Sequence, residues 1–208
     1  MKIDEVIKIG GSLHAEPGAM ESVRDWLNTT RSPATTRLLL CGGGPVVEGL
    51  RRVDEANPLS AEAAHWAAVR MMDANTRLLA DWLPGTEVVE SLALVGPGDR
   101  GFVCHGWLRE AEPNRHGERL RTGWQTTSDS IAARIAAVAG ARLTLLKHSL
   151  EATYGSPAEA AAAGVVDAEF ARHAAGVKDL RLVGVIRPGF PRDIVTASQS
   201  GRPGSGDC

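Results

Sequence analysis

Residues 6–12 read Val-Ile-Lys-Ile-Gly-Gly-Ser, an apolar run that is interrupted by one lysine and closed by two glycines. The pattern predicts a buried strand over residues 6–9 that ends in a tight turn. Lys8 lies one residue before the end of that strand. A buried ammonium is costly unless an anion or a carboxylate meets it, so Lys8 is a candidate phosphate ligand. The alternative is a lysine that reaches solvent beside an ordinary turn.

The same pattern recurs further along the chain. An almost purely apolar strand is predicted over residues 37–41, and three glycines and a proline follow it at residues 42–45. A helix is predicted to begin near Val46, and the amides at a helix N-terminus bind anions readily. A tight turn between strand and helix is the alternative. Neither glycine cluster matches the P-loop or the dinucleotide-binding fingerprint.

Two later stretches also carry polar residues at the ends of elements. Residues 126–133 read Thr-Thr-Ser-Asp-Ser-Ile-Ala-Ala and begin a helix predicted over residues 128–139. Local physics favours a capping role for these polar residues, with Asp129 in the first turn. A buried strand predicted over residues 142–146 is followed directly by Lys147. This second lysine therefore occupies the same kind of position as Lys8.

Strands and helices alternate along the chain, which predicts an α/β fold with a mainly parallel sheet covered by helices. The longest helical pattern covers residues 60–83, and residues 110–125 are predicted to be an irregular loop. Further strands are predicted at 92–95, 101–105 and 180–186, and further helices at 17–28, 158–163 and 168–175. Ligands of such sheets bind beyond the carboxyl ends of the strands, where both glycine clusters fall.

Composition limits the classes of protein. The 208 residues predict one domain over residues 1–195 and a disordered tail over residues 196–208. A net charge of -2 argues against a broad nucleic-acid surface. Three cysteines without a pairing motif argue against a disulfide framework, and no apolar run is long enough for a signal peptide or a membrane span. These features predict a cytoplasmic protein.

The four stretches together resemble the amino-acid-kinase superfamily, which includes acetylglutamate, aspartate, uridylate and carbamate kinases. They occur in the family's order and cover about residues 1–187. Residues 59–66 (Leu-Ser-Ala-Glu-Ala-Ala-His-Trp), residues 71–73 (Met-Met-Asp) and Trp124 also resemble a short branch of that superfamily. That branch includes the kinase of methanofuran biosynthesis, which phosphorylates (5-(aminomethyl)furan-3-yl)methyl phosphate to the diphosphate.

The resemblance implies a three-layer α/β/α sandwich and an ATP-dependent phosphotransferase. It implies in-line transfer to a small-molecule acceptor, with Mg²⁺ brought by ATP and held by phosphates and water rather than by a protein metal site. The furan-methyl phosphate is the favoured acceptor, and a carboxylate or a nucleotide is the alternative. A non-catalytic nucleotide- or metabolite-binding module and a subunit of a larger assembly remain further alternatives. The family also implies a homo-oligomer.

Residue roles follow from the same resemblance. The catalytic residues would be Lys8 and Lys147, which contact the moving phosphoryl group, and Asp129, which holds both ammonium groups. The implied phosphate and nucleotide ligands are Gly10, Gly11, Ser12, Gly43, Gly44 and Tyr154, and the implied acceptor ligands are Gly42, Arg51 and His65. Residues 147–154 depart from the Asp-Gly-Val-Tyr pattern of many members. His65 packed on a helix face and Arg51 in solvent are the alternatives for those two residues.

Overall fold

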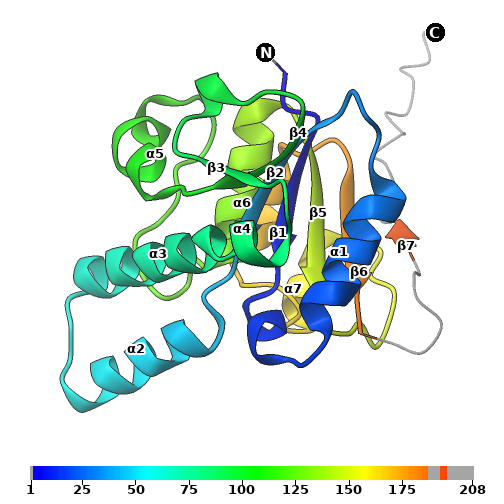
Figure 1. Cartoon of the computed structure of the whole chain (residues 1–208). Helices are drawn as coiled ribbons and strands as arrows, with labels where there is room; N and C mark the ends of the chain where they lie inside the picture. Colours follow the sequence, from blue (N-terminus) through cyan, green and yellow to red (C-terminus); the bar gives the residue numbers. More distant parts are fainter. Residues whose placement is uncertain (1, 187–192, 196–208) are drawn as a thin grey trace, which may run out of the picture.

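A seven-stranded sheet forms the centre of the computed structural model, which describes residues 2–186 and 193–195 (Figure 1). The strand order is β3-β4-β2-β1-β5-β6-β7, and all neighbours pair in parallel except β6 and β7. The strands are β1 (Glu5–Ile9), β2 (Thr36–Cys41), β3 (Glu87–Val89), β4 (Gly98–Phe102), β5 (Arg142–Lys147), β6 (Leu180–Gly184) and β7 (Asp193–Val195). The predicted α/β class with a mainly parallel sheet is confirmed.

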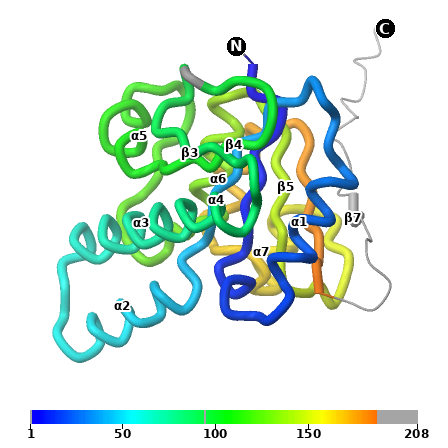
Figure 2. The backbone as a smooth tube through the Cα atoms, in the orientation of Figure 1, coloured from blue at the N-terminus to red at the C-terminus, as the bar shows by residue number. Residues whose placement is uncertain are grey.

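Helices cover both faces of this sheet (Figures 1 and 2). The α-helices are α1 (Ala19–Thr30), α2 (Gly44–Ala56), α3 (Ala61–Arg77), α4 (Leu79–Trp82), α5 (His105–Glu110), α6 (Ser128–Ala139), α7 (Pro157–Ala162) and α8 (Phe170–Ala174). The short 3-10 helices are η1 (Gly11–Ala15), η2 (Leu92–Leu94) and η3 (Glu112–Asn114). The predicted three-layer arrangement is therefore present.

Two hydrophobic cores fill the space between the sheet and its helices. Alternate residues of a strand point to opposite faces, so Val6 packs with α3, α5, α6 and α8, whereas Ile7 and Ile9 pack with η1, α1 and α4. α2 belongs to neither core, and Leu50 is its one buried residue. Figure 2 shows α2 extending away from the sheet beside α3.

Several predicted elements need correction. Residues 92–95, predicted as a strand, begin with the 3-10 helix η2, because the hydroxyl of Ser91 accepts a hydrogen bond from the amide of Ala93 and favours a local turn. β3 lies just before it and was not predicted. The long helix predicted over residues 60–83 is interrupted at Leu78, whose amide bonds to the carbonyl of Asn75 three residues earlier. The tail 196–208 lies outside the described residues.

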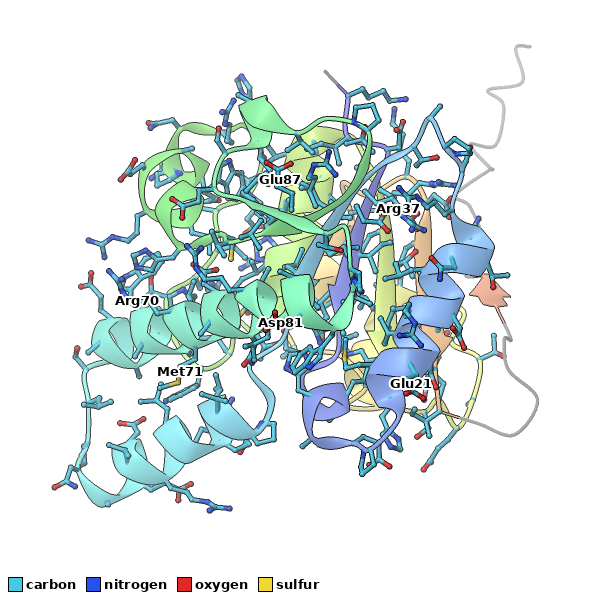
Figure 3. The ribbon with its side chains drawn as sticks, in the orientation of Figure 1. Glu21, Arg37, Arg70, Met71, Asp81 and Glu87 are labelled. Carbon is cyan, nitrogen blue, oxygen red and sulfur yellow. The ribbon has the colours of Figure 1, made fainter. Side chains whose placement is uncertain are left out.

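A buried ion pair lies at the amino-terminal end of the sheet. Arg37 of β2 is 1% exposed, and its Nε and Nη2 atoms donate to the two carboxylate oxygens of Asp99 at 2.6 and 2.8 Å. Nη1 donates to the hydroxyl of Thr30 at 3.1 Å, and Nη2 also donates to the carbonyl of Leu27 at 2.9 Å. Figure 3 labels Arg37 beside α1. This network joins α1 to β2 and β4.

Within the described residues, no helix has the length and apolar character needed to cross a membrane.

Candidate active site

The carboxyl ends of β1, β2 and β5 lie side by side at one edge of the sheet. Lys8 of β1 is aligned with Leu40 of β2 and with Leu145 of β5. Lys147 lies two residues after Leu145 on β5, so the alternation of side chains directs both lysines to the face that α6 covers. Parallel pairing alone therefore brings the two predicted lysines to the same side of the sheet.

Asp129, in the first turn of α6, lies between these two lysines. Its Oδ1 atom is 2.9 Å from Nζ of Lys8, and its Oδ2 atom accepts a hydrogen bond of 2.7 Å from Nζ of Lys147. Asp129 and Lys8 are each 5% exposed. Among the described residues, Asp129 is the one hydrogen-bonding or ion-pairing partner of either ammonium group. The cluster therefore places two positive charges, a buried one on Lys8 and a part-buried one on Lys147, in contact with one negative charge.

Burial and charge both act on the protonation of this cluster. Burial raises the pKa of the Asp129 carboxyl, but the two adjacent lysines outweigh burial, so its pKa is lowered and the group stays ionised. For Lys147, burial and the charge of Lys8 lower the pKa to about 8, although Asp129 and Asp167 oppose that change. An anion placed beside Lys147 would favour its charged form.

The two glycine turns touch each other beside this cluster. A Cβ atom on Gly11 would lie 2.2 Å from the amide nitrogen of Gly44, and one on Gly44 would lie 2.1 Å from the carbonyl oxygen of Gly11. Gly44 also has a φ of +52°, which L residues with side chains rarely adopt. The side chain of Asn75 holds the second turn by donating to the carbonyls of Gly42 and Gly43 at 2.8 and 3.0 Å.

The amides of these turns are used in different ways. Gly10 donates to the carbonyl of Leu146 at 2.8 Å, and Gly42 donates to the carbonyl of Ile9 at 2.8 Å. These two amides are therefore already occupied within the sheet. The amides that follow, at Gly43 and Gly44, start α2, and the first amides of a helix have no partner inside the helix. They are the better placed donors for an anion.

A cavity of about 770 Å³ opens beside Lys8 and Asp129, between α2, α3 and the start of α6. Its apolar wall includes Val69, Met72 and Ile131. The cavity is also lined by polar residues, an aromatic residue and the second glycine turn: Ser12, Gly42, Gly43, Gly44, Arg51, Arg52, His65, Trp124, Thr126 and Ser128. Figure 3 labels Met71 on the side of α3 nearest α2. Most of the predicted phosphate and acceptor ligands therefore face one cavity.

His65 and Arg51 are both fixed by contacts at the cavity wall. His65 is buried, burial lowers its pKa, and the neutral ring donates from Nδ1 to the carbonyl oxygen of Gly123 at 3.3 Å. The guanidinium carbon of Arg51 lies 4.2 Å from the ring centroid of Trp124. Nε1 of Trp124 in turn donates to Asp54 at 2.7 Å, which connects the loop before α6 to α2.

Tyr154 lies apart from these residues. It is half-buried, it packs against the hydrophobic core on the α6 side of the sheet, and it is not among the residues that line the cavity. The adenine contact expected for Tyr154 therefore stays a prediction.

Two residues near the site, Asn75 and Asp167, were not predicted from the sequence, and Thr126 was noted within residues 126–133 but given no role in the site. Asn75 holds the second glycine turn, and Asp167 accepts hydrogen bonds from the start of α6. Thr126 lines the cavity with a buried hydroxyl that has no hydrogen-bond partner among the described residues. Asn75 is a polar residue near the end of the buried face of α3, and this position is a signal that could have indicated its role. No local pattern distinguishes Asp167 from an ordinary loop residue.

Among the described residues, no group of three or more His, Cys, Asp and Glu side chains is arranged to hold a metal ion.

Comparison with solved structures identifies the fold. The uridylate kinase of Archaeoglobus fulgidus superposes with a TM-score of 0.60 at 13% identity, over 94% of this chain and 92% of that chain. The UMP kinase of Bacillus anthracis gives a TM-score of 0.60 at 13% identity, over 91% and 90% of the two chains. The aspartate kinase of Synechocystis gives a TM-score of 0.63 at 12% identity. The match covers 95% of this chain and 40% of that longer chain.

The sequence itself matches no protein-family model and no curated protein. Structural likeness at this low identity establishes the amino-acid-kinase type of fold, shared by uridylate and aspartate kinases, and does not establish an activity. The chemistry must therefore be argued from the residues of the site.

Proposed function

We propose that this protein is an ATP-dependent phosphotransferase that acts on a small acceptor. The observation that carries the proposal is the Lys8–Asp129–Lys147 cluster, in which a buried and a part-buried ammonium group share one carboxylate. An uncompensated buried charge is costly, so the cluster favours a ligand that brings negative charge. The glycine turns next to it supply backbone amides at a helix N-terminus, which suit a phosphate group.

The roles of the three residues follow from their positions. Lys8 and Lys147 would contact the oxygens of the moving phosphoryl group, on which negative charge spreads during transfer. Asp129 would keep the two ammonium groups apart and oriented, so that little reorganisation is needed in the transition state. The amides of Gly11, Gly43 and Gly44 would bind the same oxygens. Mg²⁺ bound to the phosphates of ATP would neutralise part of their charge.

The cavity beside Lys8 is the proposed acceptor site. Its volume of about 770 Å³ suits a small molecule. Arg51 and Arg52 can bind a phosphate or carboxylate, and the apolar wall suits a ring. We propose a phosphomonoester acceptor such as (5-(aminomethyl)furan-3-yl)methyl phosphate, within the synthesis of a one-carbon cofactor. A nucleotide acceptor such as UMP and a carboxylate such as aspartate are the competing candidates, since the similar structures are of UMP and aspartate kinases.

A coupled ADP-release assay tests this function directly. Purified protein is incubated with MgATP and, separately, with the furan-methyl phosphate, UMP, aspartate and carbamate. We expect ADP formation that depends on one acceptor and that is lost in Lys8→Ala, while circular dichroism shows an unchanged fold. Full turnover in Lys8→Ala would contradict the roles given to the cluster.

A non-catalytic binding module is the second candidate, because residues 147–154 depart from the pattern of many kinases and Tyr154 packs against the core. Calorimetry separates the two functions. ATP binding without ADP formation for any acceptor would favour the binding module. A homo-oligomer is proposed for either function, and light scattering would test it.

A further inference from the structure

Asp167 lies in the segment between α7 and α8, far in sequence from the residues of the cluster. Its Oδ2 atom accepts hydrogen bonds from the hydroxyl of Thr127 at 2.6 Å, from the amide of Thr127 at 3.2 Å and from the amide of Ser130 at 3.1 Å. Its Oδ1 atom accepts from the hydroxyl of Ser130 at 2.5 Å and from the amide of Glu169 at 3.1 Å. One carboxylate therefore binds five donors.

Four of these five donors belong to the two residues that flank residues 128 and 129. Thr127 is the N-cap of α6, and its own contact with the amide of Asp129 is long, at 3.4 Å. The cap hydroxyl instead makes its short hydrogen bond to Asp167. The start of α6 is thus held from outside the helix, by a charged group that also complements the positive end of the helix dipole.

We propose that Asp167 is a positioning residue, which fixes the first turn of α6 and thereby holds Asp129 between Lys8 and Lys147. That this position matters for catalysis rests on the proposed function, whereas the fixing of Asp129 by Asp167 does not. The contacts that carry it join residues of this chain alone, so its test needs no nucleotide or acceptor. A sub-ångström shift of Asp129 would lengthen one of its two contacts, of 2.9 and 2.7 Å, because the lysines approach different oxygens from different strands.

Asp167 also acts on the cluster through its charge. The charged groups that act on Lys147 are Lys8 on β1, Asp129 on α6 and Asp167. Lys8 disfavours the charged form of Lys147, whereas the two carboxylates favour it. Loss of the Asp167 charge and displacement of Asp129 would therefore both lower the pKa of Lys147. Loss of the charge alone would thus shift this titration in Asp167→Asn, whereas Ser130→Ala removes a hydroxyl donor to Asp167 and keeps its charge, so a shift there reports the displacement of Asp129.

The chain contains four lysines, Lys2, Lys8, Lys147 and Lys178, so NMR of carbon-13-labelled lysine side chains can follow Lys147 individually. The experiment compares the ligand-free wild type with Asp167→Asn between pH 6 and 11. The matched control is Glu112→Gln, because the Glu112 carboxylate anchors α6 elsewhere, by accepting from Nε of Arg134 at 2.8 Å. Both changes replace a carboxylate by an amide and remove an anchor of the same helix.

We expect the titration midpoint of Lys147 to fall by at least about half a pH unit in Asp167→Asn and to stay at the wild-type value in Glu112→Gln. A folded Asp167→Asn with the wild-type midpoint would overturn the proposal. Ser130→Ala, measured alongside, keeps the Asp167 charge and removes a single hydroxyl donor to it, and a smaller fall is expected there. An unchanged midpoint in folded Ser130→Ala would show that Asp167 acts on Lys147 through its charge alone and would overturn the positioning role. Because no nucleotide or acceptor is present, the result is independent of whether the protein transfers phosphate.

Discussion

Two buried charged clusters lie at opposite ends of the same sheet, and they are built differently. At the amino-terminal end, Arg37 forms a two-point ion pair with Asp99, and its other donors reach a hydroxyl and a carbonyl. At the carboxyl end, Lys8 and Lys147 share the single carboxylate of Asp129. The first cluster is neutral and uses four of the five guanidinium donors, whereas the second places two ammonium groups against one carboxylate beside a cavity.

This difference separates a structural charge from a functional one. A buried ion pair whose charges balance needs no further charge from a ligand, and breaking it is expected to destabilise the protein strongly. In a cluster of two ammonium groups and one carboxylate, one positive charge lacks a partner in direct contact, and a bound anion would supply it. Perturbed ionisable groups of this second kind occur most often at functional sites. The contrast predicts opposite consequences for mutations at the two ends.

The largest effect is expected from removing one cation at each end. Lys8→Met should lower kcat by roughly 10²- to 10³-fold, as loss of a single charge-stabilising group does. It should leave stability equal or higher, because the remaining Asp129–Lys147 pair is neutral. Arg37→Met should instead lower the free energy of unfolding by about 3 to 5 kcal/mol and leave kcat of the folded fraction unchanged. Denaturant titration and the ADP-release assay measure both quantities, and a stability loss in Lys8→Met that equals the loss in Arg37→Met would contradict the comparison.

Removing the shared carboxylate should affect both properties at once. Asp129→Asn leaves the two ammonium groups close together without the carboxylate that contacts both, so the pKa of Lys147 should fall below its wild-type value of about 8. We expect lower stability at pH 7 than in wild type and a loss of turnover. Thermal melts at pH 7 and pH 9 provide the check, and the deficit should shrink at the higher pH. A deficit that is the same at both pH values would show that the charges are not the cause.

In the wild type, a rise in pH should increase stability and decrease turnover, because both depend on the protonation of Lys147. The pKa of Lys147 is about 8 in the folded protein and 10.5 in the unfolded chain, so the unfolded chain binds more protons between these values. The Lys147 contribution to stability therefore increases as pH rises from about 8 to 10.5. Turnover that needs the charged lysine should decrease over the same range. The difference between wild type and Lys147→Met in denaturant titrations isolates this contribution, and a difference that is independent of pH would contradict the lowered pKa.

A smaller effect is expected from the glycine turns. Gly11→Ala places a methyl group 2.2 Å from the amide nitrogen of Gly44, so the two turns must separate. We expect a loss of about 1 to 3 kcal/mol, as for other overpacked sites, together with weaker ATP binding by calorimetry. Gly106→Ala in α5 is the control, because a Cβ atom there meets nothing within 4 Å. It should raise stability by about 0.5 to 1 kcal/mol.

Local patterns were sufficient to predict β1, β2, β5 and β6, because buried parallel strands are recognisable as apolar runs. They failed at residues 87–95, where β3 is only three residues long and Ser91 begins a local turn. For Asp129, local physics favours a helix cap, and its bridging role came only from the family resemblance. Asn75 and Asp167 act on partners more than 30 residues away in the chain, so no window of sequence contains the contact.

The most direct test of the central claim is phosphorus NMR of MgATP with the wild-type protein and the set of acceptors, repeated with Lys8→Met. The account predicts that wild type converts ATP to ADP with a new phosphorylated product from one acceptor, while Lys8→Met binds ATP without forming product. Product formation at the wild-type rate in Lys8→Met would contradict the account. So would ATP that remains intact with every acceptor in the presence of folded wild-type protein.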